Sequence, residues 1–259
     1  MSDNAREALY AIQRAGHTYK IKGDDLYERV REGDIFVVER AGTVYKYVYE
    51  NSGGWVYYGP DEGIENVSWR TCAYSPDDDI VVAFAGTGAR RCAYSTNSDF
   101  SQWQTVGTSN NVTLNTWEDV TYGNGRFMVV SSGGTDAFSA ILRSEDGINW
   151  DQLNFYQGLD ASLNYTGIAY GDGKWVAVGQ NRNAGSISTD NGASWSNISL
   201  PITNMKRVRY GDGKFVALSF SGNAGAYSTD GINWTQFAMP EPHIYYIDYV
   251  YGNGVWVAV

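Results

Sequence analysis

Apolar residues in this chain occur in short uninterrupted runs, and each run follows a tight polar turn. The turns share the pattern Tyr-Gly-Asx-Gly and begin at Tyr122, Tyr170, Tyr210 and Tyr251. The apolar runs occupy residues 127–130, 175–178, 215–218 and 256–259. Asn-Gly and Asp-Gly tolerate the positive φ angles of a two-residue hairpin turn, and consecutive apolar positions indicate a strand covered on both faces. The pattern predicts antiparallel hairpins repeated at intervals of 40 to 48 residues.

A second turn motif follows the apolar run in three units. Its members are Ser144, Asp146, Gly147 and Trp150; Ser188, Asp190, Gly192 and Trp195; and Ser228, Asp230, Gly231 and Trp234. The motif resembles the Asp-box, the Ser-x-Asp-x-Gly-x-x-Trp hairpin of sialidase-type propellers; residues 188–195 match its spacing in full, and the other two copies are one residue shorter. We expect the aspartate to accept backbone N–H groups, the glycine to be left-handed and the tryptophan to hold the hairpin against the sheet. In the families that the motif resembles, these turns lie at the periphery, so they predict a fold and not a chemistry.

These repeats predict an all-β protein, a small β-propeller of about five blades. A degenerate unit, residues 72–103, precedes the regular ones. The last unit stops after its second strand, and residues 44–49 and 55–58 have the pattern of two further strands. Pairing between residues 44–58 and 246–259 would close the ring through a shared blade and remove exposed edges. The alternative is a longer natural chain with additional units after Val259.

The first residues have a different pattern, a short α+β segment that we separate as residues 1–43, with the propeller at 44–259. Two hairpins are predicted around Gly16 and Gly42, and residues 24–32 read as a short helix between them. The stretches 10–14, 19–24 and 34–38 resemble the N-terminal module of bacteriophage virion proteins, particularly tail-fibre and baseplate-type proteins of cyanophages. The resemblance implies that this segment docks on other virion proteins in an oligomeric assembly, at the tail or capsid exterior.

Charge and composition limit the classes of partner that this chain is expected to bind. The formal charge of −10 and the scattered 19 lysines and arginines argue against nucleic acid. The two cysteines, Cys72 and Cys92, do not form a disulfide framework, and we expect two buried thiols. The start lacks the pattern of a signal peptide, and no apolar run approaches membrane-spanning length. The acidic stretch 77–79 is interpreted as a solvated turn, with a calcium loop as the alternative.

The sequence therefore predicts a non-catalytic virion structural protein, a fibre, adhesin or decoration component, that binds a partner or a host surface glycan. Tyr156, Phe220 and Tyr245 are candidate partner-binding aromatics, with ordinary packing as the alternative. No catalytic, cofactor or metal-binding residue is assigned. Two other functions stay open: a glycan-cleaving tail enzyme of the sialidase or depolymerase kind, for which arginines are present but glutamate after Glu145 is limited to Glu241, and an architectural connector between virion proteins.

Overall fold

The computed structural model is built from β-strands, with one short 3₁₀ helix, η4 (Phe155–Gln157), among the residues it describes. The described residues are 10–14, 17–21, 35–40, 43–50, 54–58, 68–88, 91–96, 103–106, 112, 115–134, 141–153, 155–160, 162–180, 182–220, 223–239 and 246–258. Before residue 68 only the backbone is described. The prediction of an all-β chain is confirmed.

From residue 69 onward the strands form four antiparallel sheets of four strands and one sheet of two. The first sheet contains β6 (Trp69–Ser75), β7 (Ile80–Ala85), β8 (Cys92–Ser95) and β9 (Gln104–Val106). The second contains β10 (Asn115–Gly123), β11 (Arg126–Gly134), β12 (Ile141–Ser144) and β13 (Asp151–Leu153). The third contains β14 (Asn164–Gly171), β15 (Lys174–Gln180), β16 (Ala184–Ser188) and β17 (Ser196–Ser199). The fourth contains β18 (Met205–Gly211), β19 (Lys214–Ser219), β20 (Ala224–Ser228) and β21 (Thr235–Ala238), and the two-stranded sheet contains β22 (Tyr249–Gly252) and β23 (Val255–Ala258).

The N-terminal strands form a sheet of their own, in the order β2-β1-β3-β4-β5. Its members are β1 (Tyr10–Arg14), β2 (His17–Ile21), β3 (Ile35–Arg40), β4 (Thr43–Glu50) and β5 (Gly54–Tyr58). Both predicted hairpins are present, as β1–β2 and β3–β4. The helix predicted at 24–32 lies outside the described residues. Because β3 pairs with β4, the predicted division at residue 43 falls inside a hairpin.

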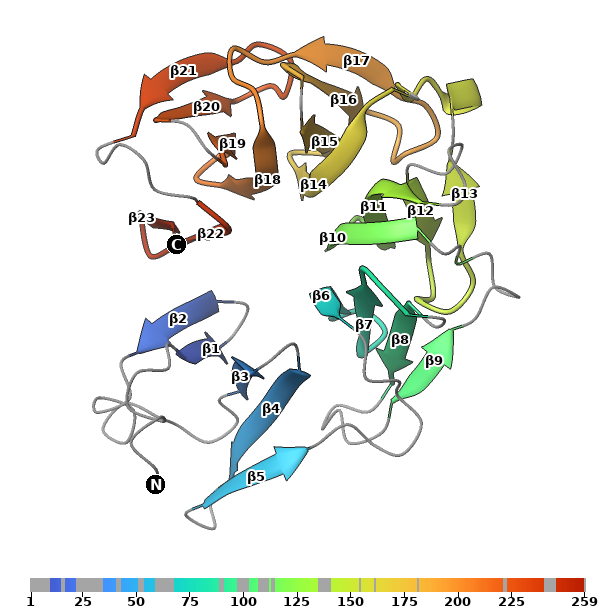
Figure 1. Cartoon of the computed structure of the whole chain (residues 1–259), viewed down its shortest axis with the longest axis vertical. Helices are drawn as coiled ribbons and strands as arrows, with labels where there is room; N and C mark the ends of the chain where they lie inside the picture. Colours follow the sequence, from blue (N-terminus) through green and yellow to red (C-terminus); the bar gives the residue numbers. More distant parts are fainter. Residues whose placement is uncertain are drawn as a thin grey trace.

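The sheets are arranged in a ring, and in the sheets from β6 onward the first strand lies nearest the centre: β6, β10, β14, β18 and β22 (Figure 1). Neighbouring first strands contact one another around this ring. The apolar runs belong to the second strands, β11, β15, β19 and β23, one step further out from the centre. The Tyr-Gly-Asx-Gly turns join first and second strands, and the residues Asn124, Asp172, Asp212 and Asn253 have φ angles of 48° to 53°. The glycines that follow these four residues also have positive φ, as the predicted two-residue turn requires.

The second strands carry the core because both of their faces are covered. Residues 127–130 of β11 and 175–178 of β15 are completely inaccessible to solvent. In β11, Phe127 and Val129 pack against the preceding sheet, and Met128 and Val130 pack against the following one. Consecutive apolar positions thus correspond to burial on both sides, as the sequence predicted.

Glycines beside the repeated tyrosines allow adjacent sheets to approach closely. The tyrosine ring of one sheet lies over the first glycine of the turn in the preceding sheet: Tyr170 over Gly123, Tyr210 over Gly171 and Tyr251 over Gly211. A Cβ atom at Gly171 would lie 2.1 Å from Cγ of Tyr210. The first glycine of Tyr-Gly-Asx-Gly is therefore required for packing between sheets.

The shared blade predicted from residues 44–58 and 246–259 is not formed by the described strands. Strands β4 and β5 extend the sheet of β1–β3, and β22 and β23 pair only with each other within the described part of the chain. The N-terminal sheet meets the C-terminal one through β2, which lies next to β22 (Figure 1). The prediction was wrong because β4 has a nearer partner in β3, joined to it by a two-residue connection.

We expect Gly171→Ala to destabilise the protein by about 2 kcal/mol, because the new methyl group overlaps the Tyr210 ring. Without that contact, replacing a strand glycine by alanine stabilises by about 0.5–1 kcal/mol. Urea denaturation measures the change. The double variant Gly171→Ala/Tyr210→Ala should be less destabilised than the sum of the two single variants, and strict additivity would contradict the proposed contact.

Candidate functional site

The three Ser-Asp-Gly-Trp turns have the geometry that their residue types predict. In the turn after β12, Asp146 Oδ1 accepts the backbone N–H groups of Ile148 and Asn149 at 2.9 and 2.8 Å. Ser144 Oγ accepts the N–H of Gly147 at 2.9 Å and donates to Asp146 Oδ1 at 3.0 Å. Gly147 has a φ of 70°, and Trp150, which is buried, donates its indole N–H to the Gly147 carbonyl.

The copy after β20 repeats this network, and the copy after β16 has a longer version of it. Asp230 accepts N–H groups from residues 232 and 233, whereas Asp190 accepts from Ser194. Burial opposes ionisation of Asp190, but hydrogen bonds from Ser194 and Ser188 outweigh it and lower its pKa to about 2. The hydrogen-bonding capacity of these aspartates is used inside the turns, so they stabilise hairpins and are not free for chemistry.

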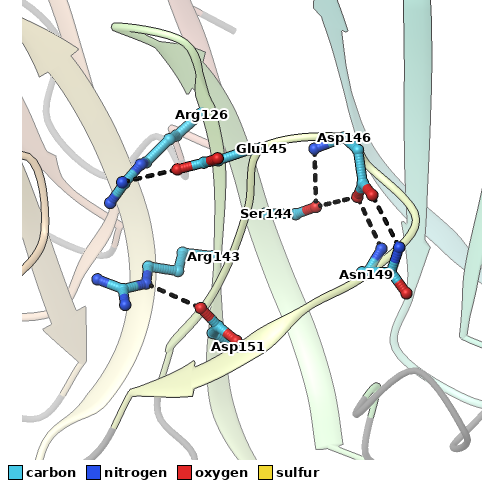
Figure 2. Close-up of a pocket in the computed structure, with 7 residues that line it drawn as sticks. All are labelled: Arg126, Arg143, Ser144, Glu145, Asp146, Asn149 and Asp151. Atoms are coloured by element: carbon cyan, nitrogen blue, oxygen red, sulfur yellow. Dashed lines mark hydrogen bonds and ion pairs between the residues drawn. The ribbon is translucent and has the colours of Figure 1, made fainter.

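A depression of about 400 Å³ lies beside the turn of Ser144 (Figure 2). Arg126 and Arg143 form one of its walls, and each is held by a carboxylate: Arg126 by Glu145 at 2.8 Å and Arg143 by Asp151 at 3.4 Å. Both guanidinium groups also donate to backbone carbonyls of the adjacent sheet's turn, at residues 191 and 192. The depression therefore lies where two sheets meet. Both of its arginines are already paired with carboxylates of the depression itself.

The centre of the ring holds a different group of charges, placed there by a repeated β-bulge. The register between first and second strands shifts at the same position in all four four-stranded sheets. The extra residues are Arg70 in β6, Glu118 in β10, Thr166 in β14 and Lys206 in β18. A bulge re-aims a side chain that regular alternation would place on the other face. Arg70, Glu118 and Lys206 thereby meet across the centre of the ring, whereas Thr166 donates to the Met205 carbonyl at 2.7 Å.

Glu118 binds two cations from two other sheets. Its Oε2 lies 2.9 Å from Lys206 Nζ, and its Oε1 pairs with Arg70 and accepts a 2.7 Å hydrogen bond from Ser132. The Glu118 side chain is only 5% exposed. Burial alone would raise its pKa, but the hydrogen bonds from Ser132 and Lys206 and the charges of Lys206 and Arg70 lower the pKa below its ordinary value. Glu118 is therefore ionised at neutral pH.

Asp119, next to Glu118, binds the other two cations of the centre. Arg209 of β18 donates to both of its carboxylate oxygens, at 2.7 and 3.3 Å, and also pairs with Asp248 at 3.0 Å. Arg207 Nε lies 3.7 Å from Asp119 Oδ1. Asp119 Oδ2 also accepts the backbone N–H of Ile168 at 3.1 Å. This carboxylate therefore connects β10, β14 and β18. We call the residues Arg70, Glu118, Asp119, Lys206, Arg207, Arg209 and Asp248 the axial charge cluster.

Of the three aromatics predicted to bind a partner, the structure describes Tyr156 and Phe220. Tyr156 is 82% exposed on η4, between β13 and β14. Phe220 is half-buried directly after β19, and its backbone N–H donates to the Asn204 carbonyl. Tyr245 lies outside the described residues. The sequence reasoning also missed the axial charge cluster, although each bulge residue lies four positions before the tyrosine of its unit.

Other candidate chemistry is accounted for by local contacts. Asp77, Asp78 and Asp79 accept hydrogen bonds from Tyr122, Ser75 and Tyr74, respectively. Among the described residues, no group of three metal-ligating side chains is found. Neither cysteine is in a disulfide. Cys92 is buried, but Cys72 occupies an exposed position in the alternating burial pattern of β6, which corrects the expectation that both are buried. In the described ranges, no helix is long and apolar enough to cross a membrane.

No protein-family model matches the chain, and no curated protein matches it. Solved structures do match. Virginiamycin B lyase from Staphylococcus aureus superimposes with a TM-score of 0.67 at 14% identity, over 92% of this chain and 72% of the lyase. YCF48 bound to D1 peptide gives 0.57 at 14% identity, over 84% and 68%. The GH74 xyloglucanase from Xanthomonas campestris gives 0.56 at 15% identity, and this chain spans 36% of it. These likenesses and the ring of four-stranded sheets define a β-propeller fold.

We expect Glu118→Gln to destabilise the protein by about 2–3 kcal/mol at neutral pH, because Arg70 and Lys206 lose their shared carboxylate. The wild-type advantage should be full above pH about 4.5, the ordinary pKa of a glutamate, and should shrink as pH falls through the lowered pKa of Glu118. Denaturation curves of both proteins between pH 7 and 3 measure this difference. A difference that is independent of pH would contradict ionisation of Glu118 as the source.

Proposed function

We propose that the chain is a non-catalytic binding propeller and a structural component of a phage virion. The observation that carries the non-catalytic part is the state of the axial carboxylates. Glu118 is held ionised by two cations, and Asp119 accepts from Arg209 and from a backbone N–H. A general acid needs a raised pKa, and a nucleophile needs a free lone pair. Glu118 has a lowered pKa, and the carboxylates of Glu118 and Asp119 are both engaged by cations, so we assign neither a catalytic role.

An enzymatic function is the alternative, and two structural neighbours are named as enzymes. At 14% and 15% identity they support the fold alone. One solved virginiamycin B lyase complex is of a variant, with histidine replaced by alanine, named as catalytically inactive. The present chain has two histidines. His17 lies on β2 in the N-terminal sheet, and His243 is outside the described residues, so neither supports placing a catalytic histidine at the centre.

The virion setting rests on the sequence of the N-terminal segment and on the Asp-box resemblance of the Ser-Asp-Gly-Trp turns. In this proposal the N-terminal segment docks on other virion proteins, at the tail or capsid exterior of an oligomeric assembly, and the repeated sheets bind a partner or a host surface glycan. The separate sheet of β1–β5 is consistent with a module distinct from the repeats. The neighbour named as bound to a peptide is a precedent for binding by a chain of this fold.

The blade count of five is part of the same proposal. Four blades are the four-stranded sheets of β6–β21, and β22–β23 begin the fifth. Since β2 lies next to β22, we propose that the N-terminal sheet packs beside the fifth blade rather than contributing strands to it.

Purified protein incubated with surface polysaccharides from candidate hosts should bind one of them without releasing reducing ends. Binding is measured by biolayer interferometry and cleavage by a reducing-sugar assay on the same samples. Release of reducing ends would overturn the non-catalytic proposal in favour of the glycan-cleaving enzyme. Absence of binding to every polysaccharide would overturn the glycan-binding part and favour an architectural connector between virion proteins.

A further inference from the structure

The axial charge cluster has an excess of positive charge in a strongly acidic chain. It contains four cations, Arg70, Lys206, Arg207 and Arg209, and three carboxylates, Glu118, Asp119 and Asp248, whereas the whole chain has a formal charge of −10. Buried charges are usually balanced by partners, because an unpaired charge is costly to desolvate. The excess is concentrated around Glu118, where one carboxylate faces two cations.

Arg70 and Lys206 keep donors that Glu118 does not use. Arg70 reaches Glu118 through Nη1 and Lys206 through Nζ, one contact each. A guanidinium carries five N–H donors and an ammonium three. The Arg70 and Lys206 side chains are 35% and 21% exposed, whereas Glu118 is 5% exposed. The two cations therefore face solvent, and their shared carboxylate lies beneath them.

A second observation comes from Arg207. Its side chain is only 9% exposed, and its Nε is buried without a hydrogen-bond partner. Its Nη1 donates to the carbonyls of Thr166 and of Lys206, so the guanidinium lies against the backbone of the two bulge residues beside it. Because its Nε lies 3.7 Å from Asp119 Oδ1, Arg207 offsets the charge of Asp119, and the unbalanced positive charge stays with Arg70 and Lys206.

We propose that the axial charge cluster binds a carboxylate group of the ligand, between Arg70 and Lys206 and above Glu118. This inference rests on the proposed binding function and specifies its chemistry. The planar fork of Arg70 matches a carboxylate in a bidentate arrangement, and Lys206 supplies a second positive charge. The local excess of one positive charge balances one negative charge. A phosphate dianion fits less well, because its two negative charges exceed the local excess of one positive charge.

Two sources present such a carboxylate, an acidic sugar and a peptide terminus, and paired probes distinguish them. Isothermal titration calorimetry at low salt compares glucuronate with glucose, and triglycine with triglycine amide. We expect binding of the carboxylate member of one pair and not of its neutral counterpart. Affinity should fall as salt is added, since the contact is between partly exposed charges.

Lys206→Gln should weaken binding about tenfold, because one of two charged contacts is lost. Lys214→Gln is the matched control: Lys214 lies on the same sheet and pairs with Asp212 at its exposed turn, so binding should be unchanged. Circular dichroism establishes that each variant is folded. Should Lys206→Gln fail to fold, Arg70→Gln tests the same site from β6.

Binding of neither carboxylate probe, or equal binding by wild type and the Lys206 and Arg70 variants, would overturn the carboxylate site. Failure of the carboxylate site and failure of the proposed function give different results. A protein that binds host polysaccharide but neither probe refutes only the site. A protein that cleaves polysaccharide, but binds glucuronate through Lys206, refutes only the non-catalytic proposal.

Discussion

The β-bulge in the first strand of each four-stranded sheet is the constraint on which the centre of this molecule depends. In a regular strand, consecutive side chains point to opposite faces. The bulge adds one residue, so Glu118 and Asp119 both reach partners near the axis, on β6 and β18. Burying those two carboxylates costs free energy that only close cations offset. The ion pairs to Lys206 and Arg209 therefore couple sheets that are not adjacent in the ring.

The rest of each sheet provides a uniform frame around this centre. Second strands are buried on both faces, tyrosines pack over the glycines of the preceding sheet, and peripheral turns are closed by aspartate and serine. These residues recur from unit to unit because each sheet packs against its neighbour in the same way. The bulge position differs in every sheet: arginine, glutamate, threonine and lysine. The residues that repeat in every unit account for the fold. The bulge residues, which differ from sheet to sheet, account for the ion pairs at the centre.

Much of the frame could be predicted from the sequence. Asn-Gly and Asp-Gly pairs identified the two-residue turns, consecutive apolar residues identified the doubly covered strands, and Asp146 and Trp150 behave as their motif predicts. The pairing of residues 44–58 with the last unit was wrong, since strand partners depend on long-range geometry that a local pattern does not contain. The axial charge cluster was missed for the same reason: Glu118 and Lys206 are 88 positions apart. Aligning the units on their tyrosines would have revealed a polar residue at the same position in the first strand of every four-stranded sheet.

The central claim is that the bulge residues of different sheets form one coupled charge cluster. A double-mutant cycle on Glu118→Gln and Lys206→Gln, measured by urea denaturation at pH 7, tests it most directly. The account predicts a coupling free energy of about 1–3 kcal/mol, because each residue stabilises the protein chiefly through the other. Single-variant effects that add to within about 0.3 kcal/mol would contradict it.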